Sequence, residues 1–190
     1  MIHSFLPVFL LLFAAPIAGD EVAGVKLPPK IEVSGKKLEL NGMGLRTKSF
    51  LEIKVYVAGL YLEKPSKDAA EVISSDQLKR VHLTFLRSVD RSQITDAIEE
   101  GFERNSKGQM PALKARLSKL ESFLTGMREK DELLVTYLPG KGTEISVKGT
   151  VQGVLEGKDF ADALFSVWLG KDPVDKELKK ALLGRTGSGR

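Results

Sequence analysis

The segment from Phe50 to Leu62 alternates two sets of side chains, which is the spacing of a β-strand and not of a helix. The more apolar set consists of Leu51, Ile53, Val55, Val57 and Tyr61, and the other set of Glu52, Lys54, Tyr56, Ala58 and Leu60. The alternation predicts a long strand within a sheet. It also predicts that Tyr56 faces away from the more apolar set.

Arg46 has the same parity as Tyr56 but lies ten residues earlier, which is roughly 33 Å along an unbroken strand. The two side chains can meet only if the chain turns between them, and Thr47, Lys48 and Ser49 form a polar run of the kind found in turns. A guanidinium and a phenol facing one apolar cavity would make a receptor for a carboxylate or phenolate. The alternative is that Arg46 is a surface residue beside a turn and Tyr56 a half-buried strand aromatic.

The N-terminal segment is typical of a signal peptide. An apolar run from Phe5 to Ile17 is followed by small residues and then by Asp20 and Glu21. The run is shorter than the about 20 residues that a membrane span needs. We therefore predict a signal peptide over residues 1–19 and export to the periplasm or the medium. An uncleaved anchor is the alternative, since no Lys or Arg precedes the apolar run.

Composition excludes several classes of function. The chain has no cysteine, so it has neither disulfides nor a thiolate metal site. The net charge is +4, and the Lys and Arg residues are interspersed with Asp and Glu instead of forming a basic stripe, which disfavours nucleic-acid binding. His82 has no second histidine outside the leader, so we expect no metal site and no catalytic dyad, and no motif indicates a cofactor.

After the leader we expect one domain over residues 20–184 and a flexible tail over residues 185–190. Strands are predicted over residues 30–33, 37–40, 50–62, 80–86, 133–137, 143–147 and 151–155, after an extended lead-in over residues 20–30. Helices are predicted around residues 69–73 and over residues 160–168. Three further helices are expected to begin at the capping box of Asp90 and Gln93, at Pro111, and at Asp172 and Pro173. Strands and helices in separate blocks indicate an α+β fold in which helices cover one face of an antiparallel sheet.

Three stretches resemble the chalcone isomerase superfamily, in particular its bacterial chalcone isomerase-like branch. They are GLRTKSFLEIKVYVAGLYLE from Gly44, VHLTFLRSVDRSQITDAIEEGF from Val81, and DFADALFSVWLGKDPVDKELKKALLG from Asp159. The resemblance implies an open-faced β-sandwich, a large antiparallel sheet covered by a layer of helices. Members of that superfamily include isomerases, fatty-acid-binding proteins and non-catalytic relatives, so the resemblance says more about fold than about activity.

Residue by residue, the resemblance implies a binding protein more than an enzyme. Arg46 falls where the family has its arginine, and Tyr56 stands where the isomerases carry a threonine, so that a hydroxyl is kept on a different side chain. Val167 stands where the isomerases carry Thr or Ser, and the helix after Asp90 has no tyrosine. Ser166 is one residue too early and faces elsewhere on its helix.

We therefore predict no catalytic residue and a ligand site at Arg46 and Tyr56 for a fatty acid or similar apolar anion. An intramolecular lyase or isomerase of the chalcone isomerase type, and a scaffold that contacts another exported protein, are the alternatives. The sequence makes no prediction of oligomeric state.

Overall fold

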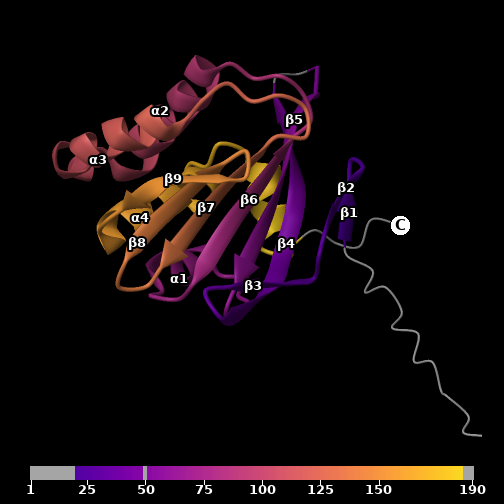
Figure 1. Ribbon diagram of the computed structural model, residues 1–190, viewed down its shortest axis with the longest axis horizontal. Coiled ribbons are helices and arrows are strands. Elements are labelled where there is room, and N and C mark those ends of the chain that lie inside the picture. The colour runs from indigo at the N-terminus through magenta and orange to yellow at the C-terminus, as the bar shows by residue number, and fades with distance from the viewer. Residues whose placement is uncertain (1–19, 49–50, 186–190) are drawn as a thin grey trace, which may run out of the picture.

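The structure is a computed structural model that describes residues 20–48 and 51–185. It contains a seven-stranded antiparallel sheet with the order β3-β4-β5-β6-β7-β8-β9, in which each strand pairs with its neighbour in sequence (Figure 1). The strands are β3 (Lys30–Val33), β4 (Lys36–Lys48), β5 (Ile53–Leu62), β6 (Lys79–Phe85), β7 (Glu132–Leu138), β8 (Gly142–Val147) and β9 (Thr150–Leu155). The predicted antiparallel sheet is confirmed, and its strands follow one another as a meander.

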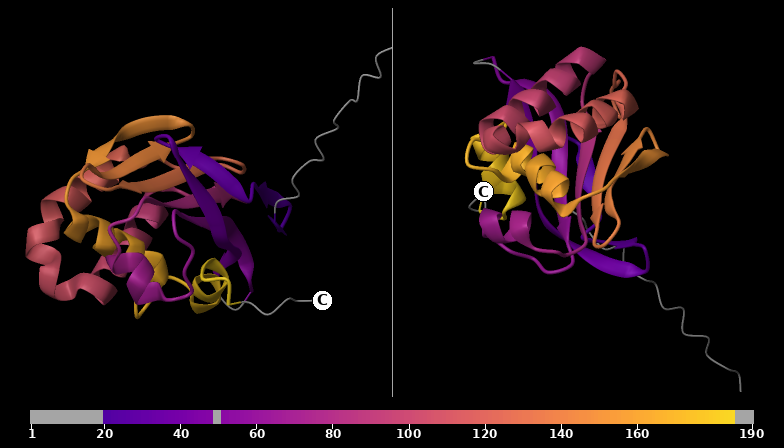
Figure 2. Two further views of the ribbon diagram at one scale, coloured as in Figure 1. Left: turned by 90° about the horizontal axis from the view of Figure 1, so that it is seen from below. Right: turned by 90° about the vertical axis from the view of Figure 1, so that its left-hand side faces the viewer.

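Helices cover one face of this sheet (Figure 2). They are α1 (Ala69–Ser74), α2 (Arg91–Ser106), α3 (Met110–Phe123), α4 (Lys158–Leu169) and α5 (Lys176–Leu182), with a 3-10 turn over Lys107–Gln109 between α2 and α3. The predicted capping box of Asp90 and Gln93 opens α2, and Pro111 lies in the first turn of α3. The α+β fold with an antiparallel sheet under a helix layer is therefore as predicted.

The sheet has a main core on its helix side and a smaller core on the other side. On β5 the main core takes Ala58, Leu60 and Leu62, and Tyr56 packs against it. Val57 and Tyr61 point to the smaller core, where they meet Leu27 and neighbouring side chains. Tyr56 thus faces away from the more apolar set, as the alternation predicts, and toward the helices.

The N-terminal residues differ from the predicted extended lead-in. Strands β1 (Asp20–Val22) and β2 (Val25–Leu27) form a hairpin, and Leu27 packs so closely on the sheet that a Cβ at Gly59 would lie 2.3 Å from its Cδ1. The Tyr61 hydroxyl donates to the Pro28 carbonyl at 2.9 Å and fixes the end of the hairpin. The hairpin turns at Ala23 and Gly24, which both have positive φ, whereas its packing on β5 is a long-range contact that the local sequence does not predict.

Three boundaries also differ from the prediction. Thr47 and Lys48 belong to β4, and β5 begins at Ile53 and not at Phe50. Helix α5 begins after Asp175, whose side chain caps it, and not at Asp172 and Pro173. The sequence predicts that Gly126 ends the helix that begins at Pro111, whereas α3 ends at Phe123, because Leu124 is already extended.

The predictions for the two chain ends concern residues that lie largely outside this structure. The predicted leader, residues 1–19, lies outside the described residues, as does the tail beyond Arg185. Within the described ranges, no helix has both the length and the apolar character required to cross a bilayer.

Candidate functional site

A pocket of about 580 Å³ lies between the sheet and helices α2 and α4, within the range of small-ligand sites. Its apolar walls come from the sheet, from α2 and from α4. They include Val55, Leu83, Phe85, Leu133, Ile94, Ile98 and Val167. Arg46 and Tyr56 also line it, so both residues of the predicted site face the same cavity.

Strand pairing brings Arg46 and Tyr56 together. The two residues are direct partners in the antiparallel register of β4 and β5, and directly opposed residues place their Cβ atoms about 5 Å apart. The register shifts between Arg46 and Thr47, so that Lys54 pairs with Thr47 and is exposed. The turn that the sequence requires between Arg46 and Tyr56 therefore exists, but it lies after Lys48.

Tyr56 is oriented by Trp168, which the sequence alone places in the core. The indole Nε1 of Trp168 donates to the Tyr56 hydroxyl oxygen at 3.1 Å. The pKa of Tyr56 is raised to about 12, mainly by burial and to a smaller extent by the charge of Asp175, while Trp168 and the Arg46 guanidinium oppose the shift. The phenol is therefore neutral at pH 7. Since its oxygen accepts from the indole, its own hydrogen can serve a ligand, and the group acts as a donor and not as a base.

Arg46 has a partner that the sequence analysis did not identify. Its Nη1 contacts Asp175 Oδ2 at 3.2 Å and also donates to the Thr47 carbonyl. The side chains of Arg46 and Asp175 are 20% and 14% exposed, so this ion pair is largely shielded from solvent. Both contacts use Nη1, whereas a carboxylate held by two parallel bonds can take the Nε and Nη2 donors.

Asp175 reaches Arg46 because helix α5 packs directly on β4. A Cβ at Gly44 would lie 2.5 Å from the Ala181 Cβ, and one at Gly42 would lie 2.1 Å from the Ala181 carbonyl oxygen. Only glycine at these two positions allows the helix to approach so closely. The two glycines thus serve helix packing, in agreement with the absence of a phosphate-loop motif around them.

The lining of the pocket carries more positive than negative side chains. Arg46, Lys48, Arg87 and Arg104 line the pocket together with Asp96 and Glu100. Arg104 pairs with Glu100 at 3.2 Å and with Asp172 at 3.7 Å. Lys48 and Arg87 take part in none of the ion pairs between described residues, so they leave a positive potential for an anionic ligand.

Two hydroxyls on the helices beside this pocket are bonded within their own helices. Ser166 donates to the Asp162 carbonyl of its own helix at 2.7 Å, and Thr95 donates to the Ser92 carbonyl at 2.9 Å. Val167, 2% exposed, lies in the pocket wall and offers no hydroxyl. Within the described part of the chain, no group of three or more His, Asp or Glu side chains is placed to hold a metal ion.

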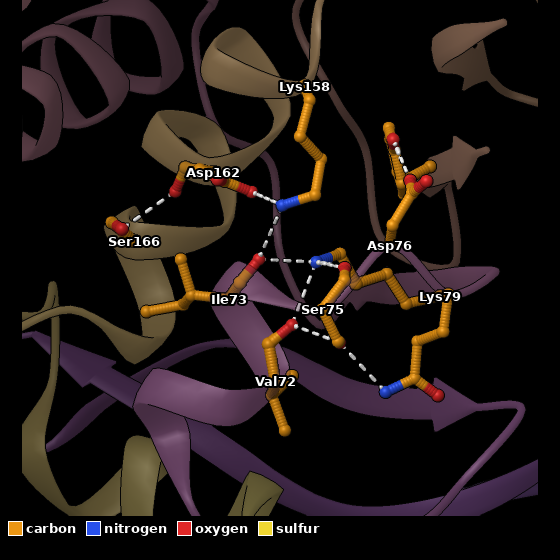
Figure 3. Close-up of polar contacts among 10 residues, drawn as sticks. Val72, Ile73, Ser75, Asp76, Lys79, Lys158, Asp162 and Ser166 are labelled. Atoms are coloured by element: carbon orange, nitrogen blue, oxygen red, sulfur yellow. Dashed lines mark hydrogen bonds and ion pairs between the residues drawn. The ribbon is translucent and has the colours of Figure 1, made fainter. Parts of the chain in front are cut away.

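A second polar cluster surrounds the buried side chain of Lys79 (Figure 3). Its ammonium donates to the carbonyls of Val72, Ile73 and Ser75 at 2.8, 2.6 and 3.1 Å. The pKa of Lys79 is lowered to about 8, mainly by burial and to a smaller extent by the charge of Lys158. Three carbonyls for three ammonium hydrogens hold the end of α1 against β6, so we assign this cluster to the fold and not to ligand binding.

Comparisons with known proteins agree with this architecture. The model of a family described as chalcone isomerase-like matches residues 19–184. The crystal structure of the Arabidopsis thaliana fatty-acid binding protein AtFAP1 superposes with a TM-score of 0.67 over 84% of this chain and 92% of that chain, at 17% identity. No curated protein matches the sequence. The likeness to AtFAP1 shows a shared fold.

Proposed function

The chain belongs to the chalcone isomerase-like family, and from that premise we propose that it is an exported binding protein that holds a fatty acid or a similar apolar anion without transforming it. The observation that carries this proposal is the direct pairing of Arg46 with Tyr56 on the wall of an apolar pocket. A guanidinium and a neutral phenol supply donors for a carboxylate, and the apolar walls receive the chain.

The chemistry of the pocket favours binding over turnover. A phenol whose pKa is raised to about 12 is a poor proton acceptor at neutral pH. The hydroxyls of Ser166 and Thr95 donate to carbonyls of their own helices, and Val167 in the pocket wall offers no hydroxyl. Fatty-acid binding by AtFAP1, a protein of the same fold, is consistent with this class of ligand.

Native mass spectrometry of the protein purified without delipidation tests the proposal. We expect a co-purified acid whose mass adduct is lost after delipidation and restored by added fatty acid. An empty protein that fails to take up any acid would refute it. Export is tested separately, by fractionating cells and sequencing the N-terminus of the mature protein; a cytosolic chain that begins at Met1 would refute export alone.

A further inference from the structure

The carboxylate of Asp175 divides its two oxygens between two tasks. Oδ1 accepts from the backbone amides of Glu177 and Leu178, both at 2.9 Å, and so caps helix α5. Oδ2 lies 3.2 Å from Nη1 of Arg46. The cap needs only an acceptor oxygen, which an asparagine or serine side chain also supplies. The negative charge of Asp175 is therefore needed only where it faces Arg46.

That charge stands where a ligand anion would compete with it. Helix α5 is fixed on β4 by its close approach to Gly42 and Gly44, and Arg46 lies farther along the same strand. Asp175 is thus held beside the guanidinium by the fold itself, and Arg46 carries a counter-ion before any ligand arrives.

We propose that Asp175 is a specificity-determining residue, an internal counter-ion that competes with the ligand's anionic group for Arg46 and lowers the affinity of the pocket for acids relative to neutral lipids. The inference rests on the proposed function. A ligand carboxylate on the Nε and Nη2 edge would bring two negative groups to one positive group in a shielded site, and each carboxylate weakens the hold of the guanidinium on the other. A neutral alcohol of the same chain length escapes that repulsion.

The neighbouring charges supply a matched control. Asp172 lies on the same connection between α4 and α5, but its carboxylate faces Arg104 at 3.7 Å. Asp172→Asn removes one negative charge near the pocket and leaves the pair of Arg46 and Asp175 intact. It therefore separates a general change in potential from release of Arg46.

The test is calorimetric titration of the purified full chain with dodecanoic acid and dodecanol at pH 7.5. Asp175→Asn should bind the acid about tenfold more tightly than the wild type, the size of one charge-assisted hydrogen bond, and the alcohol within about twofold. Asp172→Asn should change both by less than about threefold. In the background of Arg46→Ala, Asp175→Asn should change acid binding by a different factor than in the wild type, because competition for the guanidinium is then absent; a double-mutant cycle measures this difference, and a coupling of zero would refute competition for Arg46.

The outcomes are distinct. If the wild type binds the acid and Asp175→Asn binds it equally or more weakly, Asp175 only positions Arg46 and the inference is wrong, whereas the proposed function stands. If neither the wild type nor Asp175→Asn binds acid, both are wrong. Asp175→Ser, which keeps a capping oxygen, replaces Asp175→Asn if that variant does not fold, and the same gain in acid affinity is expected.

Discussion

Removing the Arg46 guanidinium should weaken the binding of fatty acids selectively. Hydrogen bonds to charged groups contribute about 1.5–3 kcal/mol each. The contribution of a bidentate pair would lie at or above the upper end of this range, but Asp175, at 3.2 Å, already neutralises part of the guanidinium charge. We therefore expect Arg46→Ala to cost about 2 kcal/mol of acid binding, or about thirtyfold in Kd. The matching alcohol should lose much less, because it needs no counter-ion.

Two further variants define the site around this result. Tyr56→Phe deletes one donor to the ligand and should cost about 1 kcal/mol of acid binding; it also removes the acceptor of the Trp168 indole, so its stability must be measured in parallel. Lys54→Ala is the matched control. Lys54 is exposed and lies outside the pocket wall, two residues from Tyr56 on the same strand, and its removal should leave both ligands unaffected.

The assay is calorimetric titration of each variant with dodecanoic acid and dodecanol, after urea unfolding has shown which variants are folded. Arg46→Ala leaves the shielded carboxylate of Asp175 without its ion-pair partner, so Arg46→Gln, which is still a donor, serves as a second variant. Equal losses for acid and alcohol would refute a carboxylate grip. A larger loss at Lys54 than at Arg46 would place the site elsewhere.

Three other predictions concern the fold and the chemistry. The pKa of Lys79 is lowered to about 8 from 10.5, so between pH 8 and 10 the unfolded chain binds more protons than the folded chain. The free energy of unfolding should therefore rise with pH over this range, by up to about 1.4 kcal/mol per pH unit. Urea unfolding should show the rise, and an equal rise in Lys79→Met would exclude Lys79 as its source. Gly44→Val should destabilise the protein by about 2 kcal/mol or more, because the new side chain meets Ala181, and unchanged melting would mean that α5 is not docked there. Chalcone cyclisation, followed by absorbance, should proceed near the uncatalysed rate because Val167 offers no hydroxyl; turnover that Arg46→Ala abolishes would establish the isomerase alternative.

The sequence predicts the elements better than their long-range contacts. Alternation along β5 and the capping box of α2 are local signals, and both predict what the structure shows. The contact of Arg46 with Asp175 spans 129 residues, and it depends on how closely α5 packs on β4. Asp175 stands two and three residues before Glu177 and Leu178, which is the spacing of an N-cap residue from the amides that donate to it. This spacing is the local signal that could have placed the start of α5 correctly.

The burial of β5 favours Tyr56 as the position of the proposed site. From Val57 to Leu62 every residue is buried, because the helices cover one face of the strand and the smaller core covers the other. Ile53 and Lys54 are exposed, and Val55 and Tyr56 are intermediate in burial between these two residues and the buried part of the strand. A polar group deeper along the strand would be cut off from a ligand, and one nearer the turn would be hydrated and would compete with water. Tyr56 occupies the position where a donor can be desolvated and still face a cavity, and the register of β4 brings Arg46 to the same level.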